Sequence, residues 1–299
     1  MDAPFDACPL AVRRAASNPH LRLDEARNIK TMAVNQSPVD SNPDLRQAWE
    51  ALRSHWHIEP TSEQLPSTPA YTALRLFLSP LLRPILRWRI RGAERIPRRG
   101  PTILAANHLS HIDPIAVIAA ARRTTHYLAK DGHFSNPATR LVMQATGQIE
   151  TQREQGGNEA LASAATILCQ GRALGIFPEG TRSKRTEPPF LLPGKTGVAR
   201  LAAAHPDAVV VPIALLGTRG IMQPQKDKFP KLWRRFEVSA GVGITWYSWL
   251  GHPQGGAMKQ EDLELLAGQE EHEIRKVLAG LYRSFTDQLM GSLASLGAP

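Results

Sequence analysis

A histidine and an aspartate five residues apart, His108 and Asp113, have the types and spacing for chemistry on an alcohol. A neutral imidazole removes the proton of a hydroxyl group while that group attacks a carbonyl carbon. A carboxylate bonded to the other ring nitrogen fixes the tautomer and stabilises the imidazolium. On a regular helix a five-residue step turns two side chains about 140° apart, so the pair requires a bend.

The surrounding sequence predicts this bend at a junction between a strand and a helix. The β-like run 102–106 precedes the pair, and Pro114 opens an apolar, alanine-rich run that is typical of a helix. The residue before a proline is disfavoured in the α region, whereas proline suits the first helical position. We therefore expect the bend at Asp113 and the helix from Pro114. Asp113 would also cap this helix, since its two oxygens allow both roles.

A second junction follows the predicted strand 173–177, where the chain continues as Pro-Glu-Gly-Thr-Arg-Ser at 178–183. Gly180 allows a close approach of the backbone to a ligand, and Arg182 presents a planar fork of donors that suits a phosphate. Taken alone, such a turn is more often a plain surface turn than a binding site.

Two more basic residues occupy similar positions. Arg153 follows the predicted strand 147–151, and Lys195 stands at the start of a predicted helix. Ligands gather at the carboxyl ends of parallel strands, so we expect both residues to reach the crevice that Arg182 lines. Pro212 interrupts the apolar run 209–215 and predicts an irregular edge or a bulge there.

The order of the predicted elements indicates the fold class. Strands and helices alternate after residue 88, which predicts an α/β domain with a mainly parallel central sheet flanked by helices. A long amphipathic helix at 261–296, with a break at Gly280 or Gly291, is expected to cover the sheet. The predicted strands are 88–91, 102–106, 126–129, 147–151, 173–177, 209–215 and 236–244, and the predicted helices are 114–122, 137–145, 158–170 and 195–204.

We divide the chain into an N-terminal extension at 1–68, a basic amphipathic segment at 69–91 and the α/β domain at 92–296. The extension is polar and rich in proline, and we expect it to be partly disordered. Near 43–57, apolar residues recur on one helical face and predict a short helix, to which we assign no role; they are Leu45, Trp49, Leu52 and Trp56.

The positive charge of the chain is local. The net charge is +9, and residues 71–100 hold eight arginines against one acid, which gives +7 of it. Leucine, isoleucine, phenylalanine and tryptophan lie among these arginines, a combination that suits an anionic membrane surface. A helix packed on the domain with solvated arginines explains the pattern equally well. Prolines and arginines exclude a spanning helix, and nucleic acid fits less well, because stacking aromatics are not interleaved with the basic residues.

The two cysteines, Cys8 and Cys169, are too few for a disulfide framework or a cysteine zinc site, which suits a reducing compartment. No metal is implied. The arginines at 13 and 14 are not followed by the apolar core of a signal peptide, so we do not expect secretion. With the basic segment, this predicts a peripheral or monotopic protein at the cytoplasmic face of the cell membrane.

Four segments, in order, resemble the sequence blocks of the glycerolipid acyltransferase family, which includes 1-acyl-glycerol-3-phosphate acyltransferases. They are 107–113, 147–153, 177–183 and 210–213, and the similarity covers about residues 88–250. The first and third blocks are highly specific together, and the other two are weak alone. His111 is a departure, because its position is variable or apolar in many relatives, and we interpret it as a partly exposed loop histidine.

The resemblance implies transfer of a fatty acyl group from acyl-CoA or acyl carrier protein to the free hydroxyl of 1-acyl-glycerol-3-phosphate, forming phosphatidic acid. No cofactor beyond this acyl donor is implied. His108 would be the base and Asp113 its orienting partner. Glu179 would hold a glycerol hydroxyl or an arginine, and Arg153, Arg182 and Lys195 the phosphate. The substrate-binding candidates are Asn107, Ser110, Arg153, Glu179, Gly180, Thr181, Arg182 and Lys195.

Other functions stay open at this point. A family member with another lysophospholipid or a glycolipid as acceptor fits the same four blocks, although three basic candidates favour a phosphate. A non-catalytic protein that binds anionic lipid through residues 71–100 is a more distant alternative. A hydrolase fits less well, because the chain has no Gly-x-Ser-x-Gly elbow. The group that stabilises the oxyanion is not identified, and a backbone amide near one of the two junctions is expected.

Overall fold

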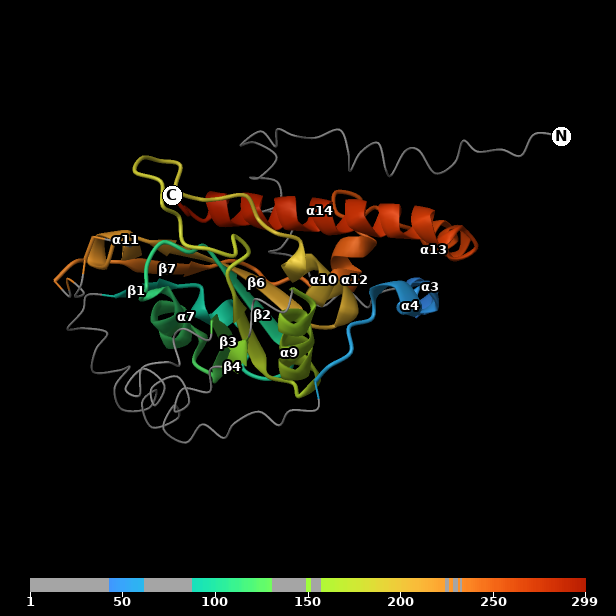
Figure 1. The fold of residues 1–299 in the computed structure, drawn as a ribbon, viewed down its shortest axis with the longest axis horizontal. Coiled ribbons are helices and arrows are strands. Elements are labelled where there is room, and N and C mark those ends of the chain that lie inside the picture. The colour runs from blue at the N-terminus through green and yellow to red at the C-terminus, as the bar shows by residue number, and fades with distance from the viewer. Residues whose placement is uncertain are drawn as a thin grey trace.

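The computed structural model describes residues 43–61, 88–130, 149–151, 157–223, 226–227, 231 and 233–299. Within them the chain forms a seven-stranded sheet with the strand order β1-β7-β6-β2-β5-β3-β4 (Figure 1). The strands β6, β2, β5, β3 and β4 run parallel, β7 is antiparallel to β6, and β1 is parallel to β7. The predicted mainly parallel sheet is therefore confirmed. The strands are β1 (Arg89–Arg91), β2 (Thr102–Ala106), β3 (Thr125–Lys130), β4 (Ile149–Thr151), β5 (Ala173–Ile176), β6 (Val209–Leu216) and β7 (Glu237–Ala240).

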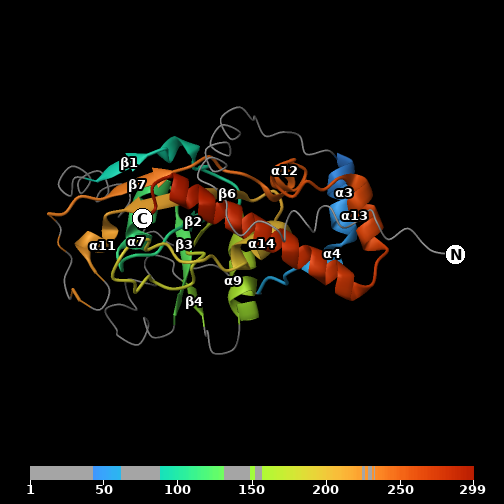
Figure 2. The ribbon, with the colours of Figure 1, turned by 90° about the horizontal axis from the view of Figure 1, so that it is seen from above.

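Helices cover both faces of this sheet. Side chains alternate along a strand, so Ile103 and Ala105 of β2 enter one core while Leu104 and Ala106 enter the other. Helix α7 packs against the second core, and α9, α10 and α14 pack against the first; α14 crosses the molecule diagonally in Figure 2. The helices are α3 (Pro43–Ala51), α4 (Arg53–Trp56), η2 (Ala93–Arg95), α7 (Asp113–Ala121), α9 (Gly157–Cys169), α10 (Gly197–Ala204), α11 (Thr218–Ile221), α12 (Trp246–Leu250), α13 (Gln260–Ala267) and α14 (Glu271–Ser295).

Most predicted elements are present with ends that differ by no more than two residues. The strand expected at 236–244 is shorter, since β7 ends at Ala240. Between the pairs Ile213–Ala240 and Val210–Ile244, two residues of β6 oppose three residues at 241–243. This is a bulge, and it places Pro212, which has no N–H to donate, where the regular pairing ends. The irregularity predicted at Pro212 is confirmed.

The prediction of a single long helix at 261–296 is wrong. The chain forms α13 and α14, and the break falls at Gly268 instead of Gly280 or Gly291. Both of these glycines lie inside α14. Its buried apolar stripe continues past each of them, so packing maintains the helix despite the low helix propensity of glycine.

Several predictions fall outside the described residues. These are the disordered start of the chain, the helix at 137–145 and the amphipathic segment up to residue 87. In the part that the structure describes, every helix is too short or too polar to cross a membrane.

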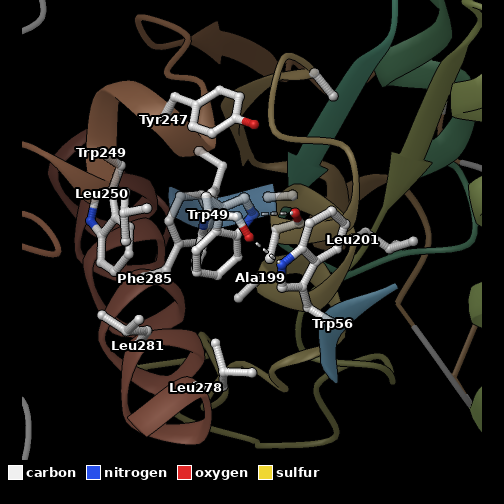
Figure 3. Close-up of a cluster of buried hydrophobic side chains, with 14 of the residues drawn as sticks. Trp49, Trp56, Ala199, Leu201, Tyr247, Trp249, Leu250, Leu278, Leu281 and Phe285 are labelled. Carbon is white, nitrogen blue, oxygen red and sulfur yellow. Dashed lines mark hydrogen bonds between the residues drawn. The ribbon is translucent and has the colours of Figure 1, made fainter. Parts of the chain in front are cut away.

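The helix predicted near 43–57 is present as α3 and α4, and it belongs to the main core (Figure 3). Trp49 is fully buried, and its indole N–H donates to the Ala203 carbonyl oxygen at 3.2 Å. Its ring lies 5.6 Å from that of Trp56 and 5.4 Å from that of Trp246. Residues 43–56 therefore complete the apolar face that α10, α13 and α14 present.

Replacing Trp49 with alanine should remove this packing and leave a large cavity. We expect the free energy of unfolding to fall by about 3–5 kcal/mol, measured by urea denaturation. Trp233→Ala is the matched control, because that tryptophan is 74% exposed, and its effect should stay within about 0.5 kcal/mol. Equal effects of the two substitutions would contradict the assignment of Trp49 to the core.

Candidate active site

The loop between β2 and α7 brings the histidine and the aspartate together. His108 Nδ1 lies 2.9 Å from Asp113 Oδ2. The Asp113 side chain is fully buried, whereas 17% of the His108 side chain is exposed. A carboxylate only accepts, so Nδ1 carries the proton and Nε2 is the basic nitrogen that a substrate can meet. The geometry that the spacing predicted is present.

The Asp113 carboxylate also shapes the loop that carries the histidine. Its Oδ2 atom accepts from the backbone N–H of Leu109 and of Ser110, each at 2.6 Å. The carboxylate thus bonds the loop before the helix, and α7 begins at Asp113 itself. The predicted helix start at Pro114 and the predicted capping role of Asp113 are wrong, because the bend lies at 107–112.

Aromatic stacking restricts the plane of the imidazole. The His108 ring lies 3.9 Å from the Phe177 ring with an angle of 10° between the planes, and Phe177 stacks in turn on Tyr127 at 5.4 Å. Gly175 makes room for this column of rings, because a Cβ atom there would lie 2.1 Å from the Tyr127 ring. The hydrogen bond to Asp113 and the stack together leave the ring of His108 little freedom to rotate.

Glu179, which the sequence predicts to hold a glycerol hydroxyl or an arginine, accepts hydrogen bonds from two backbone amides in the structure. Its side chain is buried, with Oε1 accepting from the His108 N–H at 2.6 Å and Oε2 from the Leu192 N–H at 2.8 Å. Burial raises the pKa of this carboxyl from 4.5 to about 7, and the two amide bonds only partly oppose the rise. Glu179 therefore connects the loop at 107–112 to the segment before α10.

Asn107 and Ser110, which the sequence predicts to bind substrate, make hydrogen bonds within the protein. Both are fully buried. The Asn107 amide donates to the Leu215 carbonyl oxygen at 3.0 Å and accepts from the Leu215 N–H at 2.7 Å. The Ser110 hydroxyl donates to the Met222 carbonyl oxygen at 2.8 Å. These bonds attach the loop to β6 and to the end of α11.

Two of the three basic candidates meet at the second junction. The Arg182 guanidinium contacts the imidazole of His111, and burial lowers its pKa, an effect that the nearby Asp113 carboxylate opposes. Gly180 has a φ of +70°, and a Cβ atom there would lie 3.0 Å from the Lys195 ammonium nitrogen, so the lysine side chain crosses this glycine. Thr181, which lies between Gly180 and Arg182 in the sequence, is exposed. Arg153 lies outside the described residues.

Two residues of this region were not among the predicted site residues. His111, interpreted as a loop histidine without a role, lies beside Arg182. Arg219 in α11 donates to the carbonyl oxygens of Ser183 at 3.2 Å and Arg185 at 2.6 Å, and its guanidinium lies over the Phe190 ring. The only signal for Arg219 is its position just after a predicted strand. Among the described residues, no group of three or more His, Cys, Asp or Glu side chains could hold a metal ion.

The pH dependence of stability tests the burial of Glu179. Because its folded-state pKa is raised, the folded protein holds this proton more tightly than the unfolded chain does. Its contribution is fully present below about pH 4.5 and is lost as the pH rises through about 7. Relative to Glu179→Gln, the wild-type free energy of unfolding should fall by roughly 3 kcal/mol across this window. The control is Glu187→Gln, at an exposed position of the same loop. Parallel pH profiles for wild type and Glu179→Gln would contradict the assignment.

Comparison with known proteins shows which proteins a part of this chain is similar to. The family model described as "Acyltransferase" matches residues 87–216. A 1-acyl-sn-glycerol-3-phosphate acyltransferase of Borreliella burgdorferi is 32% identical over 97 residues, which are 32% of this chain and 39% of that protein. The chloroplastic 1-acyl-sn-glycerol-3-phosphate acyltransferase LPAT1 of Arabidopsis thaliana is 29% identical over 157 residues, 50% of this chain and 41% of that protein.

The chain thus spans well under two thirds of the length of these curated relatives. Among solved structures, that of the 1-acyl-sn-glycerophosphate acyltransferase PlsC from Thermotoga maritima aligns with a TM-score of 0.45 and 18% identity, over 80% of this chain and 95% of that chain. The matched family region contains His108, Asp113 and the junction at 178–183. The match of residues 87–216 to this family model agrees with the resemblance that the four sequence blocks predict.

Proposed function

We propose that this protein is an O-acyltransferase that moves a fatty acyl group from a thioester to the free hydroxyl of 1-acyl-glycerol-3-phosphate, with phosphatidic acid as the product. The observation that carries the proposal is the partly exposed imidazole of His108, held at 2.9 Å by the buried Asp113 carboxylate. Relatives with the name 1-acyl-sn-glycerol-3-phosphate acyltransferase support the choice of acceptor.

The chemistry needs no nucleophile from the protein. His108 Nε2 takes the proton of the acceptor hydroxyl while the oxygen attacks the thioester carbonyl carbon. Asp113 stabilises the resulting imidazolium through Nδ1. The tetrahedral intermediate then breaks its carbon–sulfur bond, and the imidazolium returns the proton to the leaving thiolate. The products are an ester and a free thiol, and the histidine is neutral again.

The acceptor phosphate is assigned to the second junction. Arg182 and Lys195 both lie there, beside Gly180. The guanidinium of Arg182 is partly desolvated, and charge-assisted hydrogen bonds to a phosphate are about twice as strong as neutral ones. We also assign Arg153 to this phosphate, on the basis of its place in the second sequence block.

The oxyanion of the intermediate requires a donor that is not already engaged. The backbone N–H groups of His108, Leu109, Ser110, Gly180 and Ser183 all donate to protein oxygens. We infer that the donor is one of the three remaining amides of the second junction, at Glu179, Thr181 or Arg182. Such a fixed amide dipole stabilises a developing negative charge without reorganising.

The remaining assignments follow the family resemblance. The acyl donor is acyl-CoA or acyl carrier protein, with no further cofactor. The other partners that we propose for this protein are the lysophospholipid acceptor and an anionic membrane surface. We do not propose nucleic acid as a partner. We assign the protein to the cytoplasmic face of the cell membrane as a peripheral or monotopic protein, since its charge is concentrated at residues 71–100.

Mass spectrometry of the products tests the reaction. The purified protein should be given acyl-CoA or acyl carrier protein donors and a panel of lysophospholipid, glycolipid and neutral lysolipid acceptors. We expect phosphatidic acid from 1-acyl-glycerol-3-phosphate. His108→Ala should abolish turnover, and Asp113→Asn should lower it by orders of magnitude, because the amide favours the wrong tautomer. Both variants should stay folded by circular dichroism. Full turnover by His108→Ala would show that the base is another group, and a preferred product from another acceptor would reassign the substrate.

Substitution of Arg182 tests the phosphate site. Arg182→Ala removes a charged donor, so the Michaelis constant for 1-acyl-glycerol-3-phosphate should rise by about 10- to 100-fold with a smaller change in turnover number. Steady-state kinetics with varied acceptor measure this. The matched control is Arg98→Ala, which removes an exposed arginine before β2, at the opposite edge of the sheet. An unchanged constant in Arg182→Ala would exclude the residue from the phosphate site.

A further inference from the structure

The edge of the sheet that carries the catalytic pair also receives the start of two other strands. Strand β6 ends at Leu216, which pairs with Glu237 of the antiparallel β7. Strand β1 runs parallel to β7, and Arg89 pairs with the same Glu237. The carboxyl end of β6 and the amino ends of β7 and β1 therefore lie together. In Figure 1, α7, α11 and β1 gather at the left end of the molecule.

Large apolar side chains are exposed at this same end. The described residues contain three exposed large hydrophobic side chains. Trp233, three residues before Phe236, is 74% exposed, and Ile115, in the first turn of α7, is 56% exposed. The third, Leu265 in α13, lies at the opposite end of the molecule (Figure 1). An indole with this exposure has an apolar body and a polar N–H, which is the character that an interface between water and lipid favours.

Exposed cations surround Trp233. Arg234 and Arg235 follow it directly, and Arg89 lies at the start of the adjacent β1; all three are exposed. The ion pairs of the described residues do not include these three arginines, whereas the neighbouring acids Asp227 and Glu237 are paired with Lys231 and Arg91. The surface around the indole is therefore positive, and it is complementary to anionic phospholipid headgroups.

This surface is connected to the catalytic loop and to the basic segment. Met222, which accepts the Ser110 hydroxyl hydrogen bond, begins the stretch that leads to Trp233. At the other end of the stretch, the Phe236 ring lies 4.9 Å from that of Trp88, and the Phe236 carbonyl oxygen accepts from the Arg89 N–H at 3.2 Å. Trp88 lies within the segment 69–91 that we predict to bind membranes.

We propose that Trp233, Arg234 and Arg235 form a second membrane-docking surface, which inserts the indole into the headgroup region of an anionic bilayer and turns the catalytic edge toward its lipid. This docking surface rests on the proposed function, because a lipid acceptor and a lipid product have to move between this edge of the sheet and the bilayer. Vesicle binding itself does not depend on catalysis.

Binding to vesicles tests the surface directly. Partition coefficients of the full-length protein should be measured by co-sedimentation with vesicles of phosphatidylcholine alone and of phosphatidylcholine with phosphatidylglycerol. Trp233→Ser and the double variant Arg234→Ser/Arg235→Ser should both bind the anionic vesicles more weakly, by roughly 5-fold for each arginine removed. Leu265→Ser, which removes an exposed leucine at the other end of the molecule, should bind as the wild type does. Because segment 69–91 is also expected to bind vesicles, the partition coefficient should be measured over a range of vesicle concentrations, so that a partial loss of binding can be detected.

A parallel assay separates this proposal from the proposed function. With a soluble short-chain acceptor, all three variants should turn over like the wild type, and with acceptor embedded in anionic vesicles Trp233→Ser should be slower. If the wild type has no acyltransferase activity but Trp233→Ser still lowers vesicle binding, the proposed acyltransferase function is rejected and the proposed docking surface is supported. Vesicle binding by Trp233→Ser and the double variant equal to that of the wild type, or no binding by the wild type, would overturn the surface whatever the activity.

Discussion

The architecture of the site depends on the burial of one carboxylate. Asp113 is withdrawn from solvent, and a buried charge is tolerated only when donors replace the water it has lost. Three donors converge on its Oδ2 atom: the His108 ring and the amides of Leu109 and Ser110. To deliver two successive amides and a side chain to one oxygen, the loop has to curl around the start of α7. The conformation of the loop at 107–112 therefore follows from the need to supply protein hydrogen-bond donors to the buried Asp113 carboxylate.

The rest of the site keeps that loop in place from several directions. Asn107 attaches it to β6 through a pair of bonds with Leu215, and Glu179 accepts its first amide from the neighbouring β5 junction. The Ser183 N–H donates to the His108 carbonyl oxygen at 3.0 Å, which closes the contact between the two junctions. Leu215 lies in β6, and Glu179 and Ser183 lie in the loop that follows β5; these are the two strands adjacent to β2 in the sheet. The strand order is therefore what makes a rigid site possible.

The sequence predicted those features that depend on residues close together in the chain. The apolar run at 102–106 and the alanine-rich helix after it follow from periodicity, and the His108–Asp113 contact follows from spacing together with the bend. The roles of Glu179 and Asn107 could not be predicted in this way, because their partners lie 71 and 108 residues away in sequence. A carboxylate or an amide in a turn is ordinarily exposed, and only the packed sheet brings buried N–H groups to it. The start of α7 was misplaced for a similar reason, since the bonds to Asp113 outweigh the preference of a residue before proline.

Gly175 limits which substitutions this part of the protein can accept. It never touches the imidazole, yet the space it leaves admits Tyr127, on which Phe177 and then His108 are stacked. Adding a single methyl group at this strand position would displace the first ring and pass the displacement up to the base. Substitutions that keep the His108 imidazole in place therefore have to leave this column of rings unchanged. The exposed residues at 184–189 are free of this constraint, because none of them carries a ring of the stack.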